Sequence, residues 1–359
     1  MAWNGSLTAG SAVGSKITFT PDTSAEGGYT VSAFTAPKKG IYRFQLYGSG
    51  GTNGSTDADY TGANGNATVL GGAGGYTDGY MLLEKNQTVY VGAGGTCSAA
   101  FVSGVNGSKL SEISQSQMLL VAGAGGAAGR ACRRADYMRT AYRGGNGGGT
   151  SGAAGQSGGE GILSQDYTGG GGGTQSAGGQ PVSFRDATSG IAGTAGAGGA
   201  GTRHSAQSYN YAWGGRGGDG YFGGASGQAV ATHNSETQFL QSHAWGGGGG
   251  SGYVKTAIFS HLGKTYTSST AQGSGKAANT KGDIVVTYYA RALLPVFFDG
   301  VQLEKIFFNG VDTDSLTYNG TLVYIQKLMR RWRKCLNSMA GRSGCPVATR
   351  ALSRSALTA

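Results

Sequence analysis

Glycine is concentrated between residues 144 and 252, which hold 37 of the 72 glycines in a chain of 359 residues. Uninterrupted runs lie at 169–173 and 246–250. Glycine at this density usually marks a flexible linker. Here the runs are separated by inserts with Tyr, Trp and Phe, such as 202–213, which linkers seldom carry. We therefore expect this stretch to be ordered.

An ordered form of glycine-rich chain exists that needs almost no side chains. Without a Cβ, extended segments can lie side by side as left-handed helices with three residues per turn, in the polyproline-II conformation. Their backbone N–H and C=O groups then pair between neighbouring segments, which offsets the conformational entropy that glycine loses on ordering. We expect a polyglycine-II helix bundle over about residues 123–252, held closed by the rest of the chain.

Runs of β-forming residues flank the glycine-rich stretch on both sides. The predicted strands are 16–20, 29–35, 41–47, 77–83, 87–91, 118–122, 253–259 and 283–289. We expect 77–83 and 87–91 to form a hairpin, and 118–122 to be buried on both faces. In 41–47, Ile41, Phe44 and Leu46 are expected to face a core. The predicted fold class is all-β: a small β-sandwich with an inserted polyglycine-II bundle, over residues 1–290.

Asp-Gly and Asn-Gly dipeptides between apolar residues recur after residue 290. They occur in 296–300, in 306–310 and in a third copy at 316–324. This pattern is the strongest short hairpin signal. We therefore predict a module of β-hairpins over residues 291–325.

The hydrophobic period changes from two to that of a helix in the last segment, 326–359. Ile325, Leu328, Trp332 and Leu336 fall on one helical face, opposite Lys and Arg, which predicts a short amphipathic helix. It could anchor the chain by docking on a partner or a membrane surface, or pack on its own sheet or a neighbouring subunit. Residues 341–359 are predicted to be disordered.

The net charge of +10 resides mainly in that tail, because 326–359 hold eight Lys and Arg and no acid. The main body is close to neutral, so no specific nucleic-acid partner is expected. The spacing of the four cysteines matches no zinc-binding motif; they are Cys97, Cys132, Cys335 and Cys345. The sequence allows either a disulfide bridge between Cys97 and Cys132 or two free buried thiols at these positions. Neither a signal peptide nor an apolar run long enough to span a membrane is present.

Signs of chemistry are sparse. Residues 121–128 match a dinucleotide fingerprint but lead into glycine rather than a second parallel strand, and 273–276 lack the full phosphate-loop pattern. The four histidines share no metal spacing, and the acids are scattered. We expect no enzyme activity, no metal and no cofactor.

Five inserts between glycine runs carry the residue types of recognition surfaces, namely Tyr, Trp, Arg and His with Ser, Asn and Gln between them. They are 130–143, 160–168, 180–191, 202–213 and 229–245, and we expect them to project as loops from the ends of the bundle. The alternative is that their side chains only cap the bundle or fill its flanks. The candidate contact residues are Tyr137, Tyr142, Phe184, Arg185, Arg203, His204, Tyr209, Tyr211, Trp213, His233, Phe239, His243 and Trp245.

Six segments together resemble a known family. They are 34–48, 71–80, 89–95, 119–126, 245–253 and 282–287. Their order and spacing are similar to the glycine-rich domain of the anaplastic lymphoma kinase receptor class and its microbial relatives. The resemblance implies a β-sandwich with an inserted polyglycine-II bundle. The family that it resembles also includes bacteriophage tail adhesins, in which variable loops between glycine motifs contact the host receptor.

The Asp-Gly and Asn-Gly repeats resemble the short terminal modules of phage tail proteins. The sequence therefore predicts a bacteriophage virion protein, made in the host cytoplasm, that acts as a tail-tip or tail-fibre adhesin. Its partners would be a host cell-surface receptor, protein or glycan, and other tail proteins, with oligomer formation in the virion open. The alternatives are a virion decoration or tail-assembly protein anchored by its C-terminal region, and a receptor-type glycine-rich ectodomain.

Overall fold

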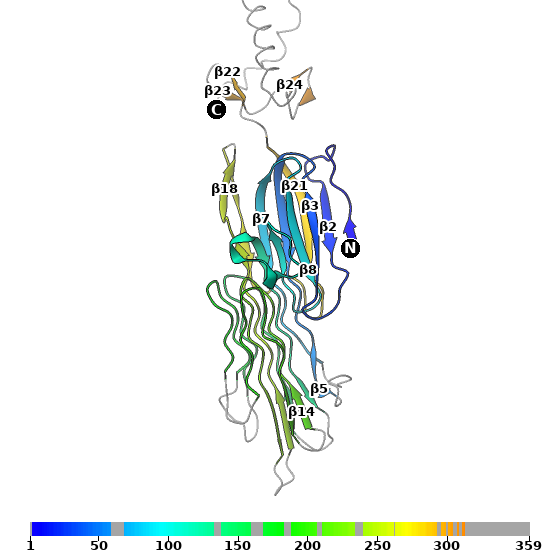
Figure 1. Cartoon of the computed structure of the whole chain (residues 1–359), viewed down its shortest axis with the longest axis vertical. Helices are drawn as coiled ribbons and strands as arrows, with labels where there is room; N and C mark the ends of the chain where they lie inside the picture. Colours follow the sequence, from blue (N-terminus) through cyan, green and yellow to red (C-terminus); the bar gives the residue numbers. More distant parts are fainter. Residues whose placement is uncertain are drawn as a thin grey trace, which may run out of the picture. The chain divides into compact units, whose positions relative to one another are not determined.

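The chain divides into two units, Met1–Ala290 and Arg291–Ala359, in a computed structural model (Figure 1). The model describes residues 2–58, 68–132, 138–158, 168–182, 188–206, 210–233, 240–261, 263–292, 296–298, 301–303, 307–308 and 311–312. Over these residues the structure is mostly β, with antiparallel and mixed sheets and no α-helix. The predicted all-β class is confirmed at this level. No helix in the described ranges has the length and apolar character needed to cross a membrane.

Two sheets of the first unit form what we call the two-sheet core. The six-stranded sheet has the order β1 (Ala2–Asn4), β2 (Lys16–Thr20), β21 (Asp283–Arg291), β4 (Gly40–Tyr47), β7 (Tyr76–Leu83) and β20 (Ser269–Ala271). The five-stranded sheet has the order β17 (Tyr253–Val254), β10 (Met118–Ala122), β9 (Ala100–Ser103), β8 (Thr88–Gly94) and β3 (Tyr29–Thr35).

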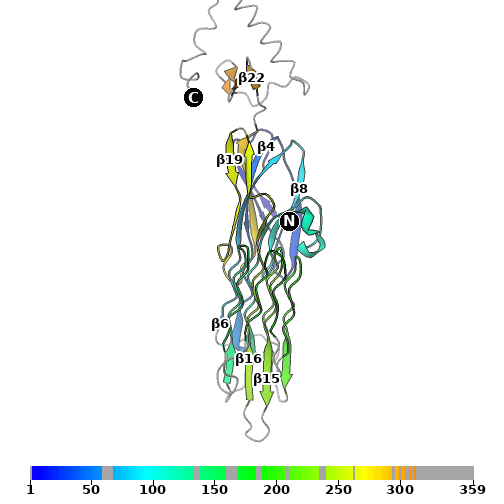
Figure 2. The same cartoon turned by 90° about the vertical axis from the view of Figure 1, so that its left-hand side faces the viewer.

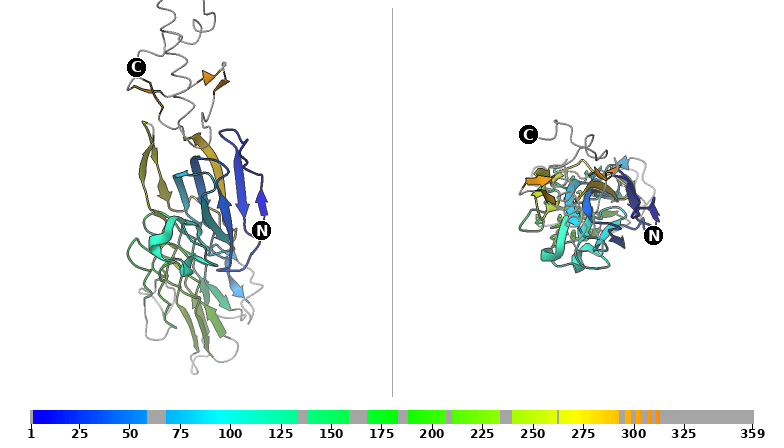
Figure 3. Two further views of the ribbon diagram at one scale, coloured as in Figure 1. Left: turned by 45° about the horizontal axis from the view of Figure 1, so that its top comes forward. Right: turned by 90° about the horizontal axis from the view of Figure 1, so that it is seen from above.

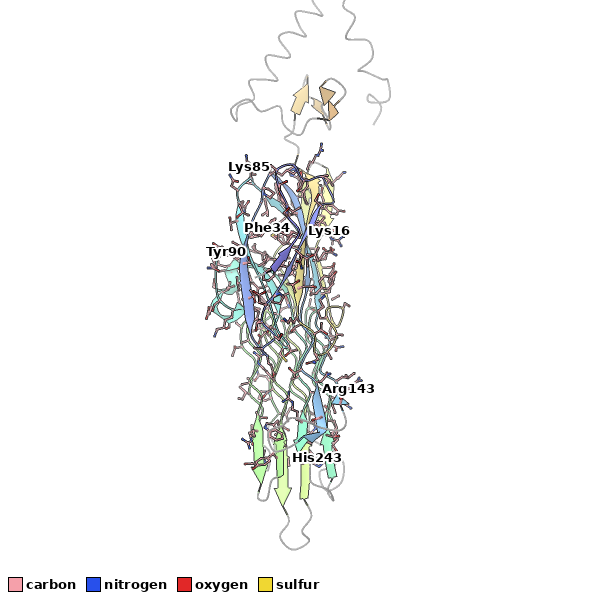
Figure 4. All side chains as sticks on the ribbon, turned by 90° about the vertical axis from the view of Figure 1, so that its right-hand side faces the viewer. Lys16, Phe34, Lys85, Tyr90, Arg143 and His243 are labelled. Atoms are coloured by element: carbon pink, nitrogen blue, oxygen red, sulfur yellow. The ribbon has the colours of Figure 1, made fainter. Side chains whose placement is uncertain are left out.

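Aromatic side chains from both sheets fill the space between them. The ring of Phe34 on β3 lies 5.6 Å from that of Tyr42 and 5.8 Å from that of Phe44, both on β4. Phe44 and Phe34 are edge to face, the geometry that aromatic rings prefer. Figure 4 shows Phe34 inside this part of the unit. Burial of these rings contributes to the hydrophobic stabilisation of the two-sheet core.

Three sequence-based predictions about these strands differ in detail from the structure. Strands 77–83 and 87–91 do not form a hairpin, because β7 pairs with β4 and β20 while β8 pairs with β3 and β9. The connection between them therefore crosses from one sheet to the other. The core face of β4 carries Tyr42, Phe44 and Leu46, whereas Ile41 is buried on the opposite face. Segment 253–259 is split between β17 and β18 (Ile258–His261).

The prediction that 118–122 is buried on both faces is confirmed. Leu120 of β10 belongs to the core between the two sheets, and Val121 faces a second cluster with Leu110 and Ile113. The short 3-10 helix Leu110–Glu112 supplies Leu110 to that cluster, and a second one, Gln115–Gln117, adjoins it. Figure 3 shows them against the side of the two-sheet core.

The glycine-rich residues run as extended segments side by side, away from the two-sheet core (Figure 2). Residues 246–250 are buried among them. The N–H groups of Gly247 and Gly250 donate to the carbonyls of Ala127 and Ala124, at 2.9 and 3.0 Å. Donors three residues apart thus reach acceptors three residues apart on one neighbouring segment.

The same spacing of three links this central segment to further neighbours. Gly145 and Gly148 donate to the carbonyls of Gly247 and Gly250, and Gly170 and Gly173 donate to those of Gly246 and Gly249. A β-ladder would instead bond a given neighbour at every second residue. The backbone groups of this part are therefore satisfied between segments.

The second unit contains β22 (Val296–Phe298), β23 (Val301–Leu303), β24 (Phe307–Phe308) and β25 (Val311–Asp312). β22 pairs with β23 and β24 with β25, both antiparallel. The strand pairing predicted on either side of the first two dipeptides is therefore confirmed, whereas the dipeptides themselves lie outside the described residues. The third copy, the amphipathic helix with Ile325, Leu328, Trp332 and Leu336, and the tail lie outside the described residues.

Candidate binding surface

Two small sheets form the end of the first unit that lies away from the two-sheet core, and we call them the distal sheets (Figure 2). The first has the order β13 (Arg203–Ala206), β14 (Asn210–Trp213), β11 (Arg130–Cys132), β5 (Gly54–Ala58) and β6 (Thr68–Val69). The second has the order β12 (Met138–Ala141), β16 (Leu240–Ala244) and β15 (Ala229–His233). The described parts of three inserts expected to be loops are therefore strands.

The distal sheets pack through alanine. Ala212, Ala229 and Ala244 are fully buried together, and the Ser242 hydroxyl donates to the carbonyl of Tyr211 at 2.6 Å. Side chains alternate across a strand, so Ala212 points inward while its neighbours Tyr211 and Trp213 point to the other face. The sequence Tyr-Ala-Trp thus places two aromatic rings on the outside.

Arg203, Tyr211 and Trp213 form one cluster on that outer face. The Arg203 guanidinium lies 4.7 Å from the centroid of the Tyr211 ring and 5.7 Å from that of Trp213. The two rings are 5.8 Å apart. Arg203 is exposed and both rings are half-buried. This is a cation–π arrangement with aromatic area still open to a ligand.

His204 has a different role from its neighbour. Its Nδ1 accepts a hydrogen bond from the Ala231 N–H at 2.9 Å, which joins β13 to β15. The imidazole is only partly exposed. We assign it to holding the distal sheets together rather than to the contact surface.

The expectation of exposed contact residues is wrong for three candidates, Tyr142, His243 and Trp245, because all three are buried. Their rings stack in a row, with Trp245 5.5 Å from Tyr142 and 6.0 Å from His243. The Trp245 indole N–H donates to the carbonyl of Gly158 at 2.9 Å. Burial lowers the pKa of His243 to about 4, so its ring is neutral at pH 7. These residues fill the flank of the distal sheets, the alternative that the sequence left open.

The remaining candidates cannot be placed. Tyr137, Phe184, Arg185, Tyr209 and Phe239 lie outside the described residues, and only the backbone of His233 is described, as the last residue of β15. Segments 207–209 and 234–239 nevertheless connect strand ends that pair with each other, Ala206 with Asn210 and His233 with Leu240. The residues that flank these two segments therefore belong to the distal sheets.

A buried polar network, which sequence reasoning missed, ties the glycine-rich segments to the two-sheet core. The carboxylate of Asp219 accepts hydrogen bonds from the Tyr29 hydroxyl at 2.9 Å, from Arg216 at 2.7 Å and from the Gly198 N–H at 2.8 Å. The Tyr29 oxygen in turn accepts from the Ala99 N–H. Burial, then the charge of Asp219, raises the pKa of Tyr29 well above its usual value, so its hydroxyl stays a donor. An Arg three residues before an Asp was the only sequence signal.

Cys97 adjoins this network and is a free, buried thiol, so the alternative of a bridge to Cys132 is excluded. Its backbone has φ of +61°, and its carbonyl accepts from Arg216 at 3.1 Å. Burial, then the charge of Glu26, raises the pKa of the Cys97 thiol to about 12. The thiol is therefore protonated and unreactive, a structural residue.

Among the described residues, no three His, Cys, Asp or Glu side chains gather in a way that could hold a metal ion. No protein-family model matches this chain, and no curated protein shows significant sequence similarity to it. The likeness to the glycine-rich domain of the anaplastic lymphoma kinase class therefore stays a hypothesis carried by the residues quoted above.

Proposed function

We propose that this chain is a bacteriophage virion protein, a tail-tip or tail-fibre adhesin that recognises a receptor on the host cell surface. The observation that carries the proposal is the exposed cluster of Arg203, Tyr211 and Trp213 on the distal sheets. Tyr, Trp and Arg dominate the binding energy of protein interfaces. Tyr and Trp do so because they offer a large contact area for few rotatable bonds. A cluster at one end of a unit is well placed to meet a surface.

The scaffold in this proposal is a polyglycine-II bundle. The support is the three-residue repeat of hydrogen bonds between Gly247 and Ala127 and between Gly250 and Ala124, which equals the helical repeat of that conformation. Such a bundle is stiff, because each segment is bonded to several neighbours. Stiffness pre-organises the contact cluster and lowers the entropy cost of binding.

The assignment to a phage virion rests on the resemblance of six segments to glycine-rich adhesin domains, together with the β22–β23 and β24–β25 hairpins, which are similar to terminal modules of tail proteins. The second candidate is a decoration or tail-assembly protein anchored by residues 291–359. A receptor-type ectodomain is the third. The second candidate requires no ligand at the distal sheets, and this separates it from the first.

The test is a competition assay with purified full-length chain, measuring how well it blocks adsorption of a phage that carries it. The variant Tyr211→Ala/Trp213→Ala is expected to lose at least tenfold in blocking potency, because it removes both rings but leaves the inward Ala212 in place. Tyr90→Ala, a half-buried tyrosine on the two-sheet core, is the matched control. Equal blocking potency of the wild type and the double variant would contradict the proposal that this cluster contacts the receptor.

Virion assembly gives an independent readout. Particles carrying Tyr211→Ala/Trp213→Ala should contain the chain in normal amount and fail to adsorb. Deletion of 326–359 should prevent incorporation if that region is the anchor. Normal adsorption of particles with the double variant, together with loss of incorporation in the deletion, would favour the decoration or assembly candidate.

A further inference from the structure

Two groups of aromatic side chains lie on the outer face of the six-stranded sheet, and together we call them the tyrosine row. Tyr47 on β4 and Tyr76 on β7 face each other with ring centroids 5.0 Å apart. Four residues along β7, the Tyr80 ring lies 5.0 Å from Tyr289 and 5.6 Å from Tyr266. Tyr289 is 41% exposed, Tyr47, Tyr76 and Tyr80 are half-buried, and Tyr266 is buried, so solvent reaches every ring of the row except that of Tyr266.

Hydrogen-bonding groups lie between the two ends of the row. The Gln45 amide donates to the Tyr76 hydroxyl at 2.9 Å. Arg43 forms a bidentate pair with Asp78, at 2.8 and 2.7 Å, and its guanidinium lies 5.7 Å from the Tyr80 ring. Rings and polar groups therefore alternate along the paired strands β4 and β7.

The charged groups that contact the rings of this face are paired. Arg43 is paired with Asp78, and Lys276 is paired with Asp283 while it also lies 5.0 Å from the Tyr47 ring. Burial, then the charge of Asp78, raises the pKa of Tyr80 to about 12, so its hydroxyl is neutral at physiological pH. Cations paired in this way beside the rings attract a polyanion such as nucleic acid or a sulfated glycan less than unpaired cations would.

We propose that the tyrosine row is a second binding site, which takes an extended, uncharged polysaccharide. A sugar ring has an apolar face of C–H groups, which packs on an aromatic ring, and a rim of hydroxyls, which bond to side chains such as Gln45, Arg43 and Asp78. The row from Tyr76 to Tyr80 spans roughly 13 Å at the rise of a β-strand, enough for several sugars in line. A site on the face of a sheet suits a chain that passes across it better than a small molecule, which needs a concave pocket.

This site is separate from the one proposed above. The tyrosine row belongs to the two-sheet core, and the Arg203 cluster belongs to the distal sheets at the other end of the same unit (Figure 1). The two sites can be inactivated independently. Failure of one proposal leaves the other standing.

The experiment is affinity electrophoresis of the full-length chain through gels that contain dextran or mannan as neutral polysaccharides, or heparin as the polyanion. We expect retardation by a neutral polysaccharide, and at least a tenfold weaker apparent affinity for Tyr76→Ala and for Tyr80→Ala. Tyr90→Ala, on the outer face of the other sheet (Figure 4), should bind like the wild type. Tyr211→Ala/Trp213→Ala should also bind like the wild type, which separates this site from the distal one.

Thermal unfolding of each variant shows whether a loss of retardation reflects misfolding, and Tyr80→Phe, which keeps the ring, should retain most of the affinity. Four results overturn the proposal. They are no retardation by dextran or mannan, retardation by heparin alone, equal loss in Tyr80→Ala and Tyr90→Ala, and self-association of the wild type that Tyr80→Ala abolishes. The last would show that the face joins two copies of this chain.

Discussion

Gly248 offers the sharpest test of how the glycine-rich segments are held. It is buried, its N–H donates to the Ala225 carbonyl at 2.9 Å, and its carbonyl accepts from the Gly218 N–H at 2.8 Å. A Cβ at this position would overlap the carbonyl group of Gly171. That carbonyl accepts a hydrogen bond from the Ala225 N–H at 2.8 Å, so a methyl group must displace backbone rather than a mobile side chain.

The cost of Gly248→Ala follows from two contributions. Overpacking a close-packed interior typically costs about 1–3 kcal/mol. Leaving a buried backbone donor such as the Ala225 N–H without its partner costs about 1–3 kcal/mol more. Alanine also lowers the conformational entropy of the unfolded chain, which offsets this loss of stability by about 0.4–1 kcal/mol. We expect a net loss of roughly 2–5 kcal/mol, a large part of the roughly 5–15 kcal/mol that stabilises a typical domain.

The assay is urea unfolding of the full-length chain, followed by tyrosine and tryptophan fluorescence. Gly10→Ala is the matched control, because Gly10 is exposed and a Cβ there would meet only the Thr8 hydroxyl at 3.8 Å. That variant should stay within about 0.5 kcal/mol of the wild type. If Gly248→Ala unfolds within the same margin, the segments are not packed backbone against backbone, and the account of the bundle fails.

Two further predictions concern buried charge. Asp219→Ala leaves the Arg216 guanidinium without its carboxylate and should lower the free energy of unfolding by about 3–5 kcal/mol. Glu84→Ala breaks only the exposed pair with Lys39 and should lower it by at most about 1 kcal/mol. Equal effects of the two variants in urea unfolding would contradict the buried network. His243 binds its proton less tightly in the folded protein, with a pKa of about 4, than in the unfolded chain, so its contribution is present above pH 6.5 and is lost as the pH falls toward 4. Between pH 7 and pH 4 the wild type should therefore lose roughly 3 kcal/mol more stability than His243→Phe, and parallel pH profiles of the two would show that the ring is solvated.

Much of the strand content could be read from local pattern. Segments 16–20, 29–35 and 118–122 were predicted with the bounds that the structure has, because alternation and β-branched or aromatic residues are properties of a few consecutive positions. The pairing of 296–298 with 301–303 and of 307–308 with 311–312 followed from Asp-Gly and Asn-Gly for the same reason. The density of glycine also predicted that the glycine-rich stretch would be packed through its backbone, with few side chains in its interior.

The candidate site was predicted only in part. Arg203, Tyr211 and Trp213 are open to solvent as expected, whereas Tyr142, His243 and Trp245 are buried although they are of the same residue types. Composition cannot separate the two groups, because burial depends on which segment lies across a strand. The described parts of three inserts form strands because they pair with segments far away in the chain, as β12 does with β16.

Local sequence thus determined where strands and tight turns form, since those depend on the backbone preferences of neighbouring residues. Only the tertiary structure decided that β7 and β8 belong to different sheets, that Tyr29 meets Asp219 from 190 positions away, and which aromatic rings face solvent. Each of these depends on contacts between segments distant in the chain. Such contacts are set by the packing of the whole unit, and no short stretch of sequence carries them.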